Sequence, residues 1–211
     1  MQETLLPLFP LEAVLLPSNI LPLHIFEERY KEMIGEAIRN KTEFGVVQAG
    51  EKGILNLGCT AIVEKVVTEY PDGRMDVLTV GRRRFEILFL DQEKSYLRGA
   101  VNFFDDEDLT EASPQLRKTA LACYELLRRN NDLVQEPPAQ DDPYLSFKIA
   151  ENVSDLSFRQ TLLAMRSEND RLMHIQQFFP DYLAMLKRAR HIHKIARTNG
   201  HGLLTPGKDS E

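Results

Sequence analysis

The chain has 211 residues, of which 43% are hydrophobic and 27% charged, and its formal net charge at neutral pH is −6. This composition is typical of a soluble chain that can bury the core of one large domain or of two small ones. The negative charge argues against a wholesale nucleic-acid binder, because that class needs extensive basic surface, but it leaves local basic patches possible.

The opening segment, residues 6–30, reads LPLFPLEAVLLPSNILPLHIFEERY. Four prolines interrupt its apolar run and no basic residue precedes it, so we expect neither a secretory signal nor a membrane span, which needs roughly 20 apolar residues. Because proline fixes its own backbone angle and lacks an N–H donor, leucine–proline pairs suit strand ends and edges. We predict two short strands, joined by a loop near residues 10–13, and then a helix that begins near Glu27.

Strand patterns dominate the chain up to about residue 104. The alternating segments 60–70 and 75–90 flank a Pro-Asp-Gly turn, which predicts a long β-hairpin. Gly81 lies in the middle of the second strand, where glycine usually marks a bulge or a bend, so we expect a sheet that curls toward a barrel. Further elements are predicted as strands at 43–48 and 97–104 and an amphipathic helix at 27–41.

The pattern becomes helical after an acidic linker at residues 105–114. Ser113 can cap the first helix with Pro114 in its first turn, and Asp155 or Ser157 can cap a later one. Pro180 must either kink one long helix or start a second helix. The sequence therefore predicts an α+β protein with a β-rich domain at 1–108, an all-helical domain at 109–198 and a disordered tail at 199–211.

No motif in the sequence predicts catalysis or cofactor binding. The GxxxxGK[ST], GxGxxG, HExxH, CxxC and GxSxG patterns are all missing from it. His191 and His193 are spaced so that helical side chains would point in different directions, which does not favour a shared metal. We therefore predict no catalytic residue, no metal and no cofactor, and we interpret Cys59 and Cys123 as small buried hydrophobic residues of a cytoplasmic protein.

Two basic stretches could bind a ligand. In the sequence GRRRF, strand alternation would place Arg82 and Arg84 on one face, as a possible phosphate or acidic-peptide site, and Arg83 on the other, where it could pair across the sheet. The last predicted helix carries a basic face opposite its apolar stripe. We interpret that face as solvated and do not expect nucleic acid as a partner, because no aromatic residue is interleaved to stack on bases.

Residues 6–38 and 55–87 together resemble the N-terminal substrate-binding domain of Lon proteases, and residues 157–179 extend the resemblance more loosely, so that it covers about 4–180. The resemblance implies a PUA-like curled β domain, or pseudo-barrel, followed by a helical bundle. Lon proteases also carry an AAA+ ATPase and a Ser-Lys peptidase, and this sequence has the motifs of neither. The resemblance therefore implies a stand-alone substrate-binding protein that is not an enzyme.

From the resemblance and the side chains present, we predict a non-catalytic module that binds unfolded or tagged polypeptides, with a protease or chaperone as a further partner. The segment before and within the first helix supplies apolar and polar groups together, and the basic strand adds charge for acidic ligands. The candidate site residues are Pro22, His24, Phe26, Arg29, Tyr30, Arg82 and Arg84. Phe26 could instead be a core residue, and a PUA-like RNA or small-molecule binder, or a hydrolase without a recognisable motif, are the alternatives.

Overall fold

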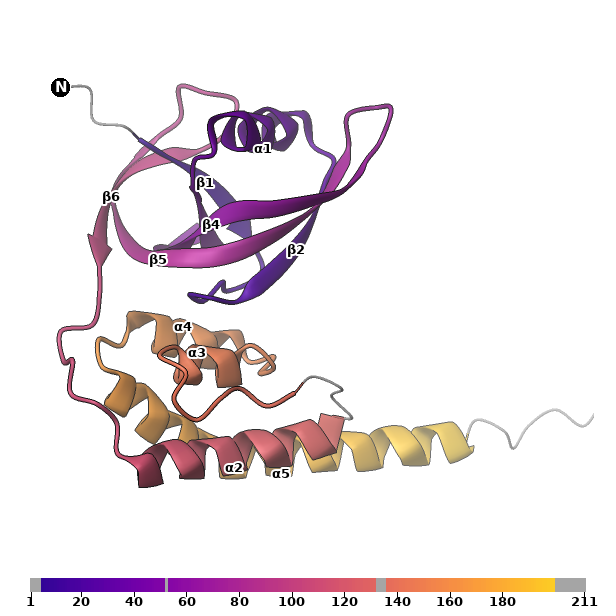
Figure 1. Ribbon diagram of the computed structural model, residues 1–211. Helices are drawn as coiled ribbons and strands as arrows, with labels where there is room; N and C mark the ends of the chain where they lie inside the picture. The colour runs from indigo at the N-terminus through magenta and orange to yellow at the C-terminus, as the bar shows by residue number, and fades with distance from the viewer. Residues whose placement is uncertain (1–4, 52, 132–135, 200–211) are drawn as a thin grey trace, which may run out of the picture.

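The computed structural model describes residues 5–51, 53–131 and 136–199, and it confirms a mixed α+β fold with a β-rich first half and a helical second half (Figure 1). We call these parts the sheet half and the helical half. The sheet half comprises β1 (Leu6–Leu11), β2 (Ile20–Ile25), α1 (Glu28–Asn40), β3 (Phe44–Gly50), β4 (Gly53–Glu69), β5 (Met75–Asp91) and β6 (Arg98–Phe104). The helical half comprises α2 (Pro114–Asn131), α3 (Leu145–Ala150), α4 (Leu156–Ala164) and α5 (Glu168–Asn199).

The six strands form one curled sheet in the order β2-β5-β4-β3-β1-β6. The long strand β5 pairs with β2 along its first part and with β6 along its last part, so the sheet closes on itself there. No ladder joins β1 to β2, although both are described throughout. The pseudo-barrel therefore has a gap in its backbone pairing between β1 and β2, which we call the seam.

The predicted β4–β5 hairpin is confirmed, and the predicted irregularity near Gly81 is confirmed as a register shift between the pairs Cys59–Arg84 and Ala61–Gly81. The backbone angle φ of Gly81 is not positive, so the conformation itself does not require glycine. The lack of space does require it, because a Cβ built there would lie 2.2 Å from the Leu16 carbonyl oxygen. The loop between β1 and β2 thus passes directly against the glycine.

In Figure 1 the helix α1 covers the top of the curled sheet, and α3 and α4 lie between the sheet and the paired helices α2 and α5. Tyr30, Met33, Ile34 and Ala37 of α1 are buried, as its amphipathic pattern predicts. The apolar core continues from these residues through the sheet into the helical half. The two halves therefore share one core.

The helix ends agree with their capping residues. The Ser113 hydroxyl accepts from the Leu116 N–H, and the Asp155 carboxylate, one of the two predicted caps, accepts from the Phe158 N–H at 2.8 Å. Pro180 lies inside α5, which continues through it as one helix. Helix α5 reaches Asn199, the first residue of the predicted disordered tail, and the remainder of that tail, 200–211, lies outside the described residues.

None of the described helices has the length and apolar character that crossing a membrane requires.

Candidate functional site

A pocket of about 910 Å³ opens at the seam. The end of β1, the second part of β2 and the first turn of α1 surround it, and Ala49 of β3 forms one side. The remaining residues that line it are Phe9, Pro10, Leu11, Glu12, Pro22, Leu23, His24, Ile25, Phe26, Glu27, Arg29 and Tyr30. Five of the seven predicted site residues therefore lie together at this pocket.

Proline keeps the β2 edge of the seam unpaired. Alternate residues of an antiparallel strand direct their backbone groups toward and away from the partner. The Gly81 N–H donates to the Asn19 carbonyl, whereas the Ile20 N–H donates to the glutamate that follows α3, so Ile20 faces away from β5. The same alternation directs the backbone groups of Pro22 and His24 into the seam, where proline has no N–H to offer.

The β1 edge has the same feature. The Leu8 N–H donates to the Leu97 carbonyl rather than to the neighbouring strand β3, so Leu8 faces away from β3. Pro10 lies two residues further along β1 and faces the same way, into the pocket. Each strand at the seam thus has a proline where a backbone N–H donor would face the other strand. Because these donors are missing, β1 and β2 cannot form a continuous ladder with each other.

Phe26 is the most prominent apolar side chain at the pocket, with 59% of its surface exposed. The interpretation of Phe26 as a core residue is therefore wrong, because the side chain lies at the end of the exposed face of β2. The His24 ring stacks on it with centroids 5.9 Å apart. Phe26 is thus an exposed ring that a neighbouring side chain holds at the mouth of the pocket.

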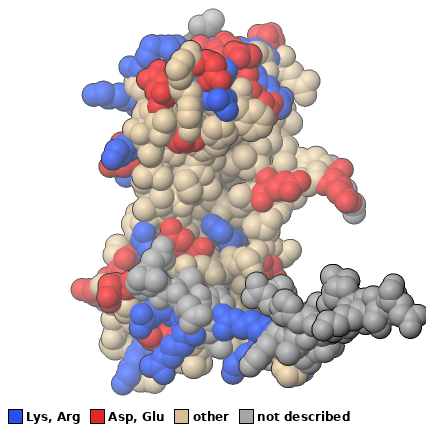
Figure 2. Space-filling view, turned by 90° about the vertical axis from the view of Figure 1, so that its right-hand side faces the viewer, with Lys and Arg blue, Asp and Glu red and all other residues tan. Residues whose placement is uncertain are grey.

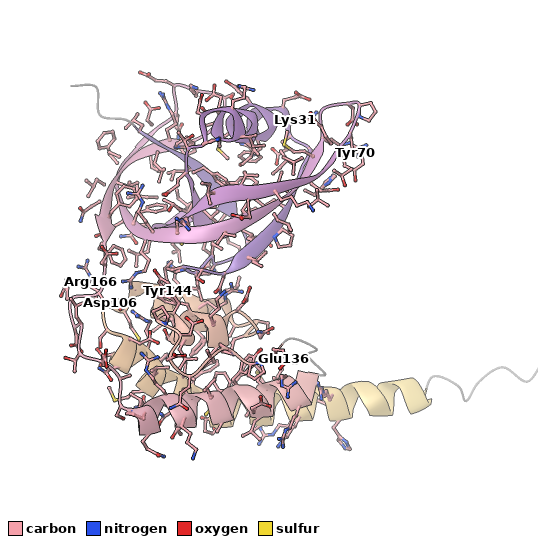
Figure 3. All side chains as sticks on the ribbon, in the orientation of Figure 1. Lys31, Tyr70, Asp106, Glu136, Tyr144 and Arg166 are labelled. Carbon is pink, nitrogen blue, oxygen red and sulfur yellow. The ribbon has the colours of Figure 1, made fainter. Side chains whose placement is uncertain are left out.

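A row of hydrogen bonds holds His24 in turn. Its Nδ1 lies 2.6 Å from the Asp76 carboxylate, which also accepts from the Tyr70 hydroxyl at 2.8 Å. The hydrogen bonds from His24 and then Tyr70 lower the pKa of Asp76, and the Asp76 hydrogen bond raises the pKa of Tyr70. Figure 3 shows Tyr70 at the end of the long hairpin, on the same side as Lys31 of α1. The hairpin therefore orients the ring that supports Phe26.

Arg29 and Tyr30 form the helical wall of the pocket. Tyr30 packs on Phe9 with ring centroids 4.2 Å apart, and burial raises its pKa. The Arg29 guanidinium lies 4.6 Å from the Tyr30 ring centroid and forms an ion pair with Glu27. Tyr30 thus belongs to the core and contributes one face, whereas Arg29 and Glu27 are polar groups at the mouth.

The expectation that Arg82 and Arg84 share a face and a ligand site is wrong. The register shift beside Gly81 disrupts the alternation, so Arg82 is exposed, Arg84 is buried with 5% exposure, and neither lines the pocket. Arg83 forms an ion pair with Glu43 at 3.0 Å, as the pairing alternative predicted.

Arg84 instead joins a buried network between the two halves. Its guanidinium donates to Asp106 at 2.7 Å and to the carbonyls that end α4. Asp106 also forms a bidentate pair with Arg171 of α5, which contacts Glu168 at 2.9 Å. Glu168 in turn accepts from the hydroxyl and N–H of Ser146 on α3. The two positive and two negative charges balance, and the network joins β5 and the segment after β6 to α3, α4 and α5.

A second pocket, of about 820 Å³, lies beside Glu36 of α1 and the residues that follow this helix, and it is lined by the start of β1, the later part of β5 and β6. The charged groups Arg83, Lys94 and Arg98 at its rim form ion pairs with Glu43, Glu36 and Asp91 respectively. Because each of these three cations is already paired with a carboxylate, none of the three is free to select a charged ligand.

The described residues offer little chemistry for catalysis. They contain no cluster of His, Cys, Asp or Glu that could hold a metal ion. Both cysteines are free, and burial raises the pKa of the Cys59 thiol to about 12. Since the thiolate is the nucleophile, Cys59 is not activated for attack.

Charged side chains are unevenly distributed over the face shown in Figure 2. Figure 2 shows acidic and basic side chains intermingled on the sheet half and a mostly uncharged surface between the halves. Basic side chains gather lower down, over the helical half.

The sequence analysis missed the wall contributed by β1, which includes Pro10 and Glu12, and the support from Asp76 and Tyr70. Glu12 is exposed at the mouth, and no hydrogen bond or ion pair to it is seen among the described residues. One signal could have found Pro10: like Pro22 it interrupts an apolar run and precedes a leucine, and proline in such a run is typical of a strand edge.

Comparison with known proteins identifies similar chains. The family model of the ATP-dependent protease La (LON) substrate-binding domain matches residues 5–179. A Lon protease from Parabacteroides distasonis is 29% identical over 156 residues, which are 70% of this chain and 19% of that protein. Lon protease 1 from Hydrogenovibrio crunogenus is 27% identical over 196 residues, 86% of this chain and 24% of that protein. The chain thus spans a quarter or less of the length of these curated relatives.

Two solved structures have a similar fold. The crystal structure of a Lon N-terminal domain protein from Xanthomonas campestris covers 84% of this chain and 99% of its own, with 25% identity and a TM-score of 0.66. The N-terminal domain of a Mycobacterium avium complex Lon protease covers the same shares with 17% identity and a TM-score of 0.61.

Proposed function

Because the chain belongs to the family of LON substrate-binding domains, we propose that it is a non-catalytic module that binds unfolded polypeptide, and that the seam pocket is its binding site. The observation that carries this proposal is the exposed Phe26 ring at the mouth of a large apolar pocket, held there by His24. A receptor for unfolded chains needs such an apolar anchor, because apolar side chains are what unfolding exposes.

The pocket also supplies polar groups that can orient a ligand. Arg29 and Glu27 lie on one side of the mouth and Glu12 on another. Apolar walls with a few polar groups at defined places are typical of sites that combine affinity with specificity. The carboxylates outnumber the cation here, which disfavours RNA as the ligand because nucleic acid needs positive surface.

The proposal places the protein in the cytoplasm, where two free cysteines are compatible with a reducing environment. It also assigns the chain no ATPase or peptidase activity of its own, since its sequence lacks a phosphate-binding loop and the GxSxG motif of a serine nucleophile. We expect neither ATP hydrolysis nor casein cleavage by the purified protein. Magnesium-dependent hydrolysis of ATP that copurifies with the protein through successive columns would contradict this assignment.

The binding site can be tested with Phe26→Ala. We expect reduced, carbamidomethylated α-lactalbumin to bind the wild-type protein and to bind this variant about 5- to 150-fold more weakly, as for an interface anchor. Leu55→Ala is the matched control, because Leu55 is also an exposed apolar residue of the sheet half, 44% exposed, but does not line the pocket. It should bind like the wild type. Equal affinity of a folded Phe26→Ala variant would remove the seam from the site.

A further inference from the structure

The free edge of β2 can do more than present side chains. The register with β5 directs the Pro22 carbonyl and both the N–H and the carbonyl of His24 into the seam. Among the described residues, no other strand pairs with this edge. A strand edge with unpaired donors and acceptors is a template for another strand.

From this arrangement we infer that the seam binds its polypeptide ligand as an added β-strand, paired with β2 at Pro22 and His24, and that it prefers segments with a basic residue beside a large apolar one. This inference rests on the proposed function and specifies the form of the ligand. The paired edge is short, because Pro22 offers no N–H and the Ile20 N–H is already bound to Glu151. A ligand therefore gains only a few backbone hydrogen bonds, and its side chains must supply the remaining affinity.

The charge preference follows from the groups at the mouth. Glu12 has no partner among the described residues, Glu27 is paired with Arg29, and Asp76 is paired with His24. The site therefore carries an excess of carboxylate beside the Phe26 ring. A lysine or arginine next to an apolar anchor complements this arrangement, whereas an acidic residue is repelled.

A peptide with methylated backbone nitrogens tests the strand pairing. Alternate N–H groups of an extended segment face the same side, so methylation of one alternating set blocks pairing with β2 and methylation of the other set does not. We expect the labelled peptide Thr-Val-Lys-Phe-Lys-Val-Thr, in which both lysines adjoin the phenylalanine, to bind the wild-type protein. One of its two alternately methylated forms should bind about 10-fold more weakly than the other, as for the loss of one or two hydrogen bonds. Equal affinities of the two forms would overturn strand addition.

The protein offers a matched pair of variants. His24→Pro removes the outward N–H, and Pro22 shows that this edge accommodates proline without loss of the ladder with β5. His24→Ala removes the same side chain but keeps the N–H. We expect His24→Pro to bind the peptide about 3- to 10-fold more weakly than His24→Ala. If His24→Pro does not fold, the methylated peptides alone decide the question.

The charge preference has its own test. The same peptide with both lysines replaced by glutamate should bind more weakly at low salt, and added salt should reduce the difference. Glu12→Gln should reduce it as well. Equal binding of the two peptides would overturn the preference for basic segments.

The outcomes separate the two proposals. If Phe26→Ala weakens binding but neither backbone methylation nor His24→Pro does, the seam binds polypeptide without strand addition, and the present inference is wrong. If the wild-type protein binds neither the peptide nor unfolded lactalbumin, both proposals are wrong. A wild-type dimer that His24→Pro dissociates would assign the β2 edge to a second copy of the chain and overturn the inference.

Discussion

The seam between β1 and β2 and the buried network of Arg84, Asp106 and Arg171 between the two halves, which we call the junction, leave their polar groups in opposite states. At the junction, Arg84, Asp106 and Arg171 are largely withdrawn from solvent and bonded to one another. At the seam, the backbone groups of Pro22 and His24 lack partners among the described residues, and Phe26 is exposed. A structural region satisfies its polar groups internally, whereas a binding region leaves some for a ligand. This comparison supports the proposed division, in which the junction stabilises the fold and the seam binds the ligand.

The strongest test of the structural side is Arg171→Ala. This change leaves Asp106 and Glu168 without their shared partner in a buried place, and we expect a loss of about 3–5 kcal/mol in the free energy of unfolding. Urea denaturation of the purified variant measures it. Arg83→Ala is the control, since its ion pair with Glu43 is largely exposed and is worth about 0–1 kcal/mol. Similar losses in the two variants would remove the distinction between junction and surface.

Gly81 gives the next largest effect. In Gly81→Ala the new methyl group must displace the backbone at Leu16, so we expect a destabilisation of about 1–3 kcal/mol from overpacking. Gly50→Ala is the matched control, because no atom lies within 4 Å of a Cβ at that position. A Gly81→Ala variant as stable as Gly50→Ala would show that the loop before β2 does not press on β5.

Acid should weaken the junction. Burial opposes ionisation of Asp106, but the hydrogen bonds and charges of Arg171 and Arg84 outweigh it, so the pKa of Asp106 lies below its ordinary value. A carboxylate with a lowered folded-state pKa contributes stability above its unfolded pKa of about 4, and this contribution is lost as the pH falls through the folded-state value. We expect the urea denaturation midpoint of the wild type to fall as the pH is lowered below about 4, and to fall more steeply than the midpoint of Asp106→Asn. Parallel curves would contradict the role of Asp106.

The smallest expected effect on stability distinguishes the seam. Asp76→Ala removes the exposed carboxylate that holds His24, and we expect the free energy of unfolding to change by only about 0.5 kcal/mol. Affinity for unfolded lactalbumin should nevertheless fall by about 2- to 5-fold, because the ring that supports Phe26 loses its own support. Glu64→Ala, at an exposed position of β4, should change neither quantity. An Asp76→Ala variant with unchanged affinity would mean that Phe26 does not need this support.

Local patterns account for much of what the sequence analysis predicted correctly. The β4–β5 hairpin follows from two alternating segments around a Pro-Asp-Gly turn, and the first helix follows from its apolar stripe. Pro22 and His24 lie in β2 and Phe26 directly follows it, so the sequence already places these residues together. Interactions within a few residues are visible in the sequence without knowledge of the topology.

Other features depend on contacts between distant segments. The burial of Arg84 follows from the register shift beside Gly81 and from partners about 80 residues later in the chain, which alternation along one strand cannot reveal. Likewise, Pro10 and Glu12 join the pocket only because β1 pairs with β3 and leaves the gap beside β2. The expectation that Arg82 and Arg84 share one face of the strand was wrong for this reason.

Backbone amide exchange, measured with and without unfolded lactalbumin, tests the account most directly. The His24 N–H faces the seam, whereas the N–H groups of Leu23 and Ile25 face β5 and are already protected. We predict that the ligand slows exchange at His24 and around Phe26 and leaves residues 163–171 at the junction unchanged. Unaltered exchange at the seam, or protection at the junction instead, would contradict the assignment of function to the seam.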